Sequence, residues 1–180
     1  MVTDAELIES SLVDGASFAP VFDRHFRAIH RFLRGRVGPE LADDLASETF
    51  MTAYRRRAAY DLERSDAAPW LYGIAVNLLR QHRRSEERRL KAYARAAVSD
   101  SPTDSVDGPL DGALAAALVA LGDVDRNLIL LYAWAGLSYE QLAEALSLPL
   151  GTVRSRLSRT RSRLRAELEP ALASGRGGFA

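Results

Sequence analysis

The sequence predicts an all-α protein of two small helical domains joined by an acidic flexible linker. Apolar residues recur with a helical period through most of the chain, and no stretch alternates with the two-residue period of a strand over a useful length. Residues 98–110 are rich in Ser, Asp, Pro and Gly and poor in large apolar groups, as in a linker. At 180 residues, the chain has room for one domain or two small ones.

The first domain is expected over residues 1–95 and begins with a helix that Gly38 and Pro39 end. Pro69 falls in the first turn of a later helix, where its missing N–H group is not needed. The three helices of this domain are expected at about 17–36, 40–58 and 69–94, with a polar loop at 61–66.

The second domain is expected over residues 111–170, after a linker at 96–110 and before a disordered tail at 171–180. Its four helices are expected at about 111–121, 124–135, 138–146 and 152–169.

Composition excludes several classes of protein. The chain has no Cys, so it forms no disulfide, thiolate metal site or thiol redox sensor. No apolar run approaches the roughly 18 residues that span a bilayer, so we expect no membrane insertion. The first residues are acidic and amphipathic, unlike a signal peptide, so the cytoplasm is the expected location.

The formal net charge is zero, but the charges are unevenly distributed along the chain. Residues 55–95 hold eleven Arg or Lys and five Asp or Glu, and residues 151–165 hold six Arg and no acid. Residues 96–125 hold six Asp and no base. Because the basic charge lies in two segments on either side of an acidic one, the net charge of zero does not exclude a nucleic-acid binder.

Residues 136–159 have the pattern of a helix-turn-helix. Ser138 is a candidate N-cap, and Gln141 follows at the spacing of a capping box. The inner face of this helix is expected to carry Leu142, Ala143 and Leu146. The expected turn contains Pro149 and Gly151, and Thr152 is expected to open the second helix.

The second helix has two contrasting faces. A narrow apolar stripe is expected to face the core, formed by Val153, Leu157, Thr160, Leu164 and Leu168. The opposite face carries a central row of serines flanked by two rows of arginines: Ser155, Ser158 and Ser162, between Arg154, Arg161 and Arg165 on one side and Arg156, Arg159 and Arg163 on the other. Small residues and arginines suit a helix in a DNA major groove. The alternative is a solvated basic face.

The segment 43–54 carries an acidic face. Asp44 and Glu48 are four residues apart and therefore share one side of a helix, which Met51 extends. This pattern fits a docking surface for a basic partner. It fits equally well acids that complement a helix N-terminus. A carboxylate metal site is disfavoured because no histidine is suitably placed, so no metal or cofactor is expected.

The segment 70–84 pairs an apolar side with a polar one. The apolar side is expected to carry Trp70, Leu71, Ile74 and Leu78. The polar side carries Gly73, Asn77, Arg80 and Arg84, which would suit contact with unpaired bases and phosphates. A solvated face is again the alternative. The three histidines, at 25, 30 and 82, show no ligand spacing.

Taken together, these segments resemble an extracytoplasmic-function sigma factor of bacterial RNA polymerase over residues 17–168. The motifs are Asp44-Leu-Ala-Ser-Glu-Thr-Phe50, Trp70-Leu-Tyr-Gly-Ile-Ala-Val-Asn77 and the helix-turn-helix that ends at Arg159. The resemblance implies sigma domain 2 before the linker and sigma domain 4 after it. It also implies an anti-sigma protein as a partner.

The resemblance also implies roles for individual residues. Docking on the clamp coiled coil of the largest subunit of the polymerase core is implied for Asp44, Leu45, Glu48, Phe50 and Met51. Opening and reading of the −10 element are implied for Leu62, Arg64, Asn77, Arg80, Arg83 and Arg84. Reading of the −35 element in promoter DNA is implied for Thr152, Val153, Arg154, Ser155, Arg156, Ser158 and Arg159.

Two other classes of function are less well supported by the sequence. A stand-alone helix-turn-helix regulator, with an N-terminal half that senses a ligand or partner, would bind its duplex tightly without polymerase. An enzyme is disfavoured, because the sequence shows no nucleophile–base pair, phosphate loop or metal cluster, and no catalytic residue is predicted.

Overall fold

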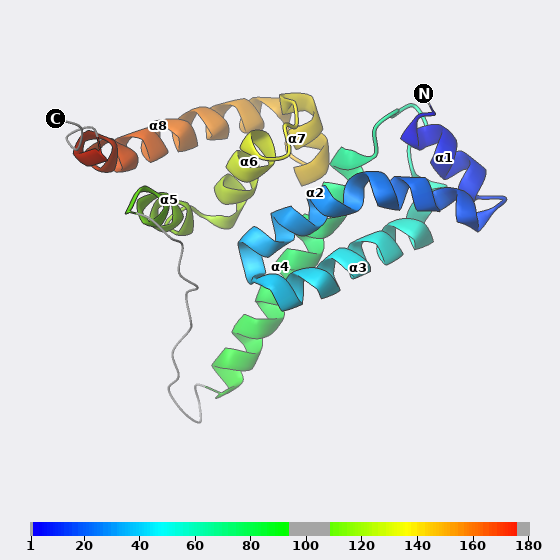
Figure 1. Cartoon of the computed structure of the whole chain (residues 1–180), viewed down its shortest axis with the longest axis horizontal. Helices are drawn as coiled ribbons and strands as arrows, with labels where there is room; N and C mark the ends of the chain where they lie inside the picture. Colours follow the sequence, from blue (N-terminus) through cyan, green and yellow to red (C-terminus); the bar gives the residue numbers. More distant parts are fainter. Residues whose placement is uncertain (1, 94–108, 176–180) are drawn as a thin grey trace. The chain divides into compact units, whose positions relative to one another are not determined.

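The computed structural model describes residues 2–93 and 109–175, and every regular element in these ranges is helical (Figure 1). The chain divides into two compact units, one N-terminal and one C-terminal. Most of the predicted linker and the last five residues lie outside the described ranges. Within those ranges, no helix is long and apolar enough to cross a membrane.

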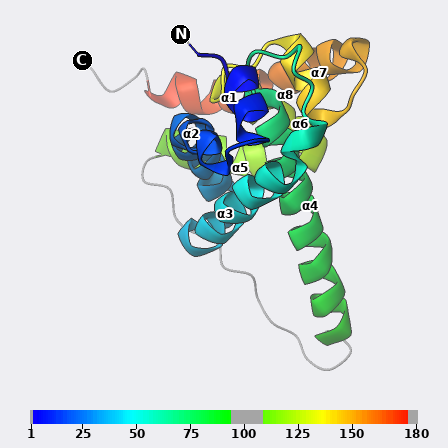
Figure 2. The same cartoon turned by 90° about the vertical axis from the view of Figure 1, so that its right-hand side faces the viewer.

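The N-terminal unit is built on α2 and α3, which lie side by side, with α4 packed across both (Figures 1 and 2). The C-terminal half of α4 extends beyond the other two helices (Figure 2). The elements are α1 (Asp4–Ser11), η1 (Gly15–Phe18), α2 (Ala19–Val37), α3 (Pro39–Arg56), η2 (Arg57–Ala59) and α4 (Ala68–Tyr93).

The boundary between α2 and α3 follows from Gly38 and Pro39, as predicted. Gly38 has a φ of +82°, a conformation that glycine adopts without steric cost, and its N–H donates to the Arg34 carbonyl at 3.2 Å. Pro39 is then the first residue of α3, a position where proline is favoured. Pro69 occupies the predicted first turn of α4.

Helix α1 was not predicted, although a short signal for it was present. Thr3 caps the helix through a capping box with Glu6: the Glu6 amide donates to Thr3 Oγ1 at 3.2 Å, and the Thr3 amide donates to Glu6 Oε2 at 2.7 Å. Ile8 is fully buried. The Thr-x-x-Glu spacing at residues 3–6 could therefore have predicted the helix.

The buried face of α4 differs slightly from the prediction. Leu71 and Ile74 are buried as expected, but Leu78 is only half-buried and Leu79 takes its place in the core. The shift arises because α4 packs against both α2 and α3, which widens its buried side. The core of this unit also includes Val21, Ile29, Leu33, Leu45, Phe50, Tyr72, Ala75 and Val76.

Most residues of the remaining helices belong to the C-terminal unit: α5 (Pro109–Val119), α6 (Asp123–Ala133), α7 (Tyr139–Leu146) and α8 (Leu150–Gly175). Both α5 and α6 pack against the long α8. Ala117, Leu121 and Leu164 form one buried cluster, against which Leu118, Ile129 and Leu168 pack. Helix α8 continues through Pro170 to Gly175, so residues 171–175, expected in a disordered tail, are helical.

Candidate nucleic-acid interface

The capping box that opens α7 forms as the sequence predicted. The Gln141 amide donates to Ser138 Oγ at 3.2 Å, and the Ser138 amide donates to Gln141 Oε1 at 2.9 Å. The backbone amide of Glu140 and the Ser138 hydroxyl hold the pKa of the Glu140 carboxyl below its usual value. These contacts fix the start of the first helix of the motif.

The turn between α7 and α8 depends on Ser147, which the sequence did not indicate. Ser147 has a φ of +52°, and its amide donates to the Glu144 carbonyl at 3.1 Å. The Leu148 amide donates to the Ala143 carbonyl at 2.9 Å. This pair of bonds is a Schellman motif, usually formed with glycine at the position that Ser147 occupies.

Helix α8 begins at Leu150, two residues before the predicted start at Thr152. The Thr152 and Val153 amides both donate to the Pro149 carbonyl, at 2.9 Å and 3.1 Å. Gly151 therefore lies inside the first turn of α8 rather than in the connecting turn. Pro149 remains outside the helix, where its lack of an N–H group costs no helical hydrogen bond.

The core face of α8 is confirmed. Val153 and Leu157 are fully buried, and Thr160 and Leu164 are also buried. The opposite face is exposed at its three central serines, 155, 158 and 162. Val153, which the resemblance placed among the DNA-binding residues, is thus a core residue, while Thr152 is half-buried.

The arginines of α8 differ in how they are held. Three are tied to other groups of the C-terminal unit. Arg156 pairs with Asp125 at 2.8 Å, and the Arg161 guanidinium lies 4.3 Å from the centre of the Tyr132 ring. Arg163 pairs with Glu167 at 2.8 Å. Arg154 has only a distant contact, 3.9 Å from Glu140.

Arg159 and Arg165 are the least constrained arginines of α8. Arg159 is exposed, and its Nε donates to the Ser155 carbonyl of its own helix at 3.3 Å. Arg165 is exposed and forms no ion pair among the described residues. Their guanidinium groups can therefore reach an external anion without first breaking an ion pair.

A shallow hollow lies beside the exposed serine and arginine face of α8 in the C-terminal unit. Its volume is about 150 Å³, and it is lined by Leu121, Asp125, Arg156, Arg159, Thr160 and Arg163. Three of the six lining residues are arginines, so the hollow presents mainly positive charge. Asp125 is the single acid in the lining. No local sequence pattern indicates Asp125, because the residue lies 31 positions before its partner Arg156.

The acidic face of α3 is on the surface, whereas two other residues for which the resemblance implies docking are buried. Asp44, Glu48 and Met51 are exposed, with Met51 52% accessible. Leu45 and Phe50 are each 4% accessible and belong to the core. Asp44 and Glu48 have no hydrogen-bond or ion-pair partner among the residues that the structure describes.

Asp43, next to Asp44, has a different role. Its Oδ1 accepts from His30 Nε2 of α2 at 2.7 Å, so Asp43 links two helices of the same unit. Glu40 is the acid in the first turn of α3, where a negative charge stabilises a helix N-terminus. Asp44 lies beyond this turn, so complementing the helix dipole does not account for it.

The predicted polar face of α4 is exposed at Asn77, Arg80 and Arg84. Arg83 is half-buried and lies beside that face. In the preceding loop, Leu62 is 44% accessible, and Arg64 Nε donates to Asp61 Oδ2 at 3.3 Å. The loop and the helix thus offer an apolar side chain, an amide and cationic groups to solvent from consecutive segments.

Comparison with known proteins supports the same two-part organisation. The family model for Sigma-70 region 2 matches residues 21–89, and that for Sigma-70 region 4 matches residues 111–164. The chain is 32% identical over 170 residues to the ECF RNA polymerase sigma factor SigM of Mycobacterium tuberculosis. This match covers 90% of this chain and 83% of SigM.

Two further relatives agree. The chain is 31% identical over 170 residues to the ECF RNA polymerase sigma factor BldN of Streptomyces coelicolor; the match covers 88% of this chain but only 64% of BldN. Among solved structures, it resembles the sigma factor RpoE in complex with the anti-sigma factor NepR from Bartonella quintana. The TM-score is 0.69 and the identity 26%, covering 84% of this chain and 96% of that one.

Proposed function

The chain belongs to the extracytoplasmic-function family of RNA polymerase sigma factors, and we propose that its two units divide promoter recognition between them. In this proposal, residues 1–95 act as sigma domain 2 and residues 111–170 as sigma domain 4, with residues 96–110 between them. The exposed serine and arginine face of α8, backed by a buried stripe, is the observation that carries the proposal.

The −35 element is read by α8 in the major groove. Ser155 and Ser158 are small and exposed, so the helix can approach base edges closely. Arg159 is free to extend toward a base or phosphate, whereas Arg156 is oriented by Asp125. An arginine whose direction is already set loses less conformational entropy on binding a guanine, which favours Arg156 as a base reader.

Docking to core polymerase uses the exposed part of the acidic face, namely Asp44, Glu48 and Met51. These two carboxylates have no partner within the described part of the chain and lie beside an accessible apolar side chain, which suits a basic partner surface with an apolar centre. Leu45 and Phe50 act indirectly, because their burial holds α3 in place. Phe50 packs against Phe22 of α2 with the ring centres 4.9 Å apart.

The −10 element is read by the loop 61–66 and by the exposed face of α4. Leu62 offers an apolar group to an unpaired base, and Asn77 offers an amide for its edge. Arg80 and Arg84 follow on the same face and supply cations for the DNA backbone. No chemistry is assigned to the chain itself: it is a binding subunit that acts in the cytoplasm.

An anti-sigma protein is a further proposed partner. The support is the similarity to RpoE, whose structure was solved in complex with the anti-sigma factor NepR. Such a partner would compete with polymerase by covering exposed surface of either unit.

Run-off transcription tests the proposed function. Purified core polymerase is incubated with genomic fragments, with and without this protein, and the transcripts are sequenced. We expect discrete start sites that depend on the protein. Tight specific duplex binding by the protein alone, without promoter-dependent transcripts, would instead favour the stand-alone regulator.

A further inference from the structure

Asp4, the first residue of α1, is a carboxylate buried in the N-terminal unit. It is only 2% accessible, although aspartate is rarely fully buried unless it is paired. Nothing in the proposed promoter contacts uses this residue. Its position beside the loop 61–66 suggests a role there.

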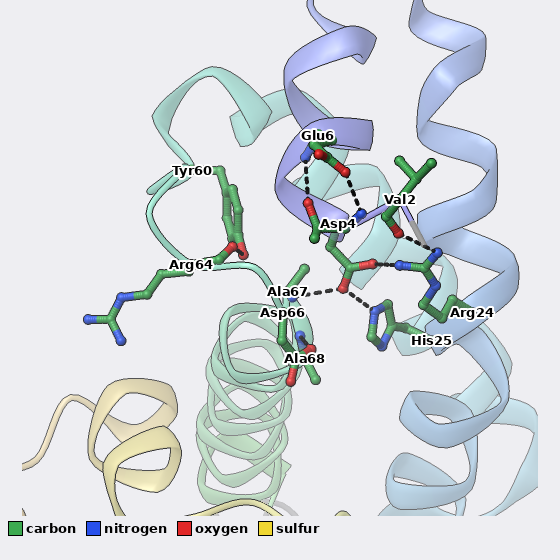
Figure 3. A network of polar contacts seen from close by, with 11 residues as sticks. Val2, Asp4, Glu6, Arg24, His25, Tyr60, Arg64, Asp66, Ala67 and Ala68 are labelled. Atoms are coloured by element: carbon green, nitrogen blue, oxygen red, sulfur yellow. Dashed lines mark hydrogen bonds and ion pairs between the residues drawn. The ribbon is translucent and has the colours of Figure 1, made fainter.

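The Asp4 carboxylate is held from two other segments of the unit (Figure 3). From α2, Arg24 donates to Oδ1, and His25 Nε2 donates to Oδ2 at 2.6 Å. From the start of α4, the Ala67 amide donates to Oδ2 at 2.9 Å. One side chain of α1 therefore links α2 to the residue where the loop 61–66 ends.

The backbone of Asp4 adds a second link to the same loop. Its amide donates to the Ser65 carbonyl at 3.0 Å. Asp4 therefore bonds to the residues on both sides of Asp66: its amide donates to the Ser65 carbonyl, and its carboxylate accepts from the Ala67 amide. Asp66 itself forms an Asx turn just before α4, with its Oδ1 accepting from the Ala68 amide at 2.9 Å.

The loop is also held by contacts that do not involve Asp4. The Tyr60 hydroxyl donates to the Arg64 carbonyl at 2.7 Å, and Asp61 Oδ1 accepts from the Glu63 amide at 3.1 Å. Tyr60 also packs against Trp70 of α4 at a ring distance of 4.9 Å. The loop is therefore fixed at both ends while Leu62, at its tip, remains exposed.

We propose that Asp4 is a positioning residue for the −10-reading loop: its carboxylate joins α1, α2 and the start of α4 so that residues 61–66 have one conformation before DNA arrives. This role rests on the proposed function of the loop. Pre-organisation matters because ordering a free loop on binding would reduce the affinity for DNA. Helix α1 then serves −10 recognition without touching the promoter.

A metal site is the competing explanation of the same cluster. Asp4, His25 and Asp66 offer ligand atoms within 4.8 Å of one another. However, the Arg24 guanidinium is in direct contact with Asp4, and a second cation there would be repelled. N–H donors already satisfy both oxygens of Asp4, so the cluster is complete without an ion.

The test compares the full-length Asp4→Asn variant with a matched control, Glu9→Gln, which makes the same chemical change at an exposed position of α1. Hydrogen–deuterium exchange is measured across the free protein. We expect faster exchange in α1 and residues 61–67 of Asp4→Asn and unchanged exchange in α8. Exchange that accelerates in α2, α3 and α4 as much as in α1 and residues 61–67 would show a general packing role and overturn the proposal.

The second measurement uses holoenzyme formed with each variant. The probe is a labelled non-template-strand oligonucleotide carrying the −10 element of a promoter that wild-type holoenzyme transcribes. We expect Asp4→Asn to weaken its binding roughly tenfold, the loss of about one base contact, with core affinity and −35 duplex binding unchanged. Wild-type affinity in a folded Asp4→Asn variant would overturn the proposal.

Two additions keep the outcomes distinct. If Asp4→Asn does not fold, Arg24→Gln, which changes a half-exposed partner, is measured in its place with the same expectations. Zinc at micromolar concentration is added to the wild-type protein. A rise in its thermal stability that is lost in His25→Gln would favour the metal site.

If wild-type holoenzyme does not bind the −10 oligonucleotide, the assigned function of the loop fails. The exchange result still tests whether Asp4 links the three segments.

Discussion

Arg156 of α8 and Asp125 of α6 form an ion pair with an N–O distance of 2.8 Å, in the hollow beside the exposed serine and arginine face of α8. Both side chains are about one-third exposed, at 37% and 33%. A pair with this exposure contributes little to stability, because water screens it. Its consequence is geometric: Asp125 restricts the directions that Arg156 can take.

Removing this restriction should reduce sequence discrimination more than affinity. In Asp125→Ala we expect tighter binding to non-specific duplex, since one negative charge near the DNA is lost. We also expect weaker preference for the base pair that Arg156 reads. Fluorescence anisotropy at fixed salt, across single-base variants of the −35 element, checks both effects. The control Glu169→Gln removes an exposed charge from α8, and equal loss of discrimination there would contradict the expectation.

Arg156 and Arg165 should differ in the type of contact that they make. Arg156→Ala should weaken −35 binding by about 1–3 kcal/mol, with the loss concentrated at one base pair. Arg165→Ala should weaken binding about equally on every DNA sequence. It should also reduce the slope of log affinity against log salt concentration by about 1. The same duplex series measured at several salt concentrations separates the two patterns. A sequence-independent loss for Arg156→Ala would make this residue a phosphate contact.

The acidic face of α3 should act on polymerase and not on −35 DNA. We expect Asp44→Ala combined with Glu48→Ala to weaken core binding by about 1 kcal/mol or more, because two charges at the contact are lost. Binding of the isolated protein to a −35 duplex should not change. Asp23→Ala, which removes an exposed charge from α2, is the control. Parallel loss of both activities in the double variant would contradict docking at this face.

The helix-turn-helix shows which local features the sequence could predict. The Ser138–Gln141 capping box and the buried stripe of α8 follow from spacing alone, and both are confirmed. The turn at Ser147 could not be predicted in this way. A positive φ usually indicates glycine or asparagine, and here it occurs at serine because two backbone hydrogen bonds hold it. The pattern instead favours Gly151 as the turn residue, and Gly151 lies inside the first turn of α8.

Side-chain contacts across long sequence separations were beyond the reach of pattern analysis. Asp125 lies 31 residues from Arg156, and Asp4 lies 63 residues from Ala67. No periodicity links such pairs, since helix packing brings them together. The acidic face of α3 was predicted from spacing, but the burial of Leu45 and Phe50 required the packed helices.

The buried stripe of α8 should determine the stability of the C-terminal unit. Leu157 is fully buried, so Leu157→Ala should lower the free energy of unfolding by about 2–5 kcal/mol. Ser158→Ala, one residue further on the exposed face, should change it by less than about 0.5 kcal/mol. Urea denaturation followed by circular dichroism checks both values. A small effect of Leu157→Ala would mean that the cavity collapses or that α8 is not held by this stripe.

The Asp4 network should make stability depend on acidity. Burial opposes ionisation of Asp4, but hydrogen bonds from His25 and the Ala67 amide, with the charges of His25 and Arg24, hold the pKa of its carboxyl below the usual value. Asp66 and Tyr60 also face this group, and burial followed by the Asp4 charge raises the pKa of the Tyr60 phenol.

Because the folded-state pKa of Asp4 is lowered, its stabilisation is present above the unfolded value of about 3.9 and is lost as the pH falls through the folded value. Asp4→Asn should therefore lower the free energy of unfolding by about 1.5–3 kcal/mol at pH 7, as expected when hydrogen bonds to a charged group are lost. The difference from wild type in the free energy of unfolding should shrink progressively below about pH 4.

Urea titrations at pH 7, 5, 4 and 3 measure this difference, with Glu9→Gln as the control. A difference that stays constant across this series would show that the ionised carboxylate of Asp4 does not contribute to folding, because only an ionisable group can lose its contribution on protonation.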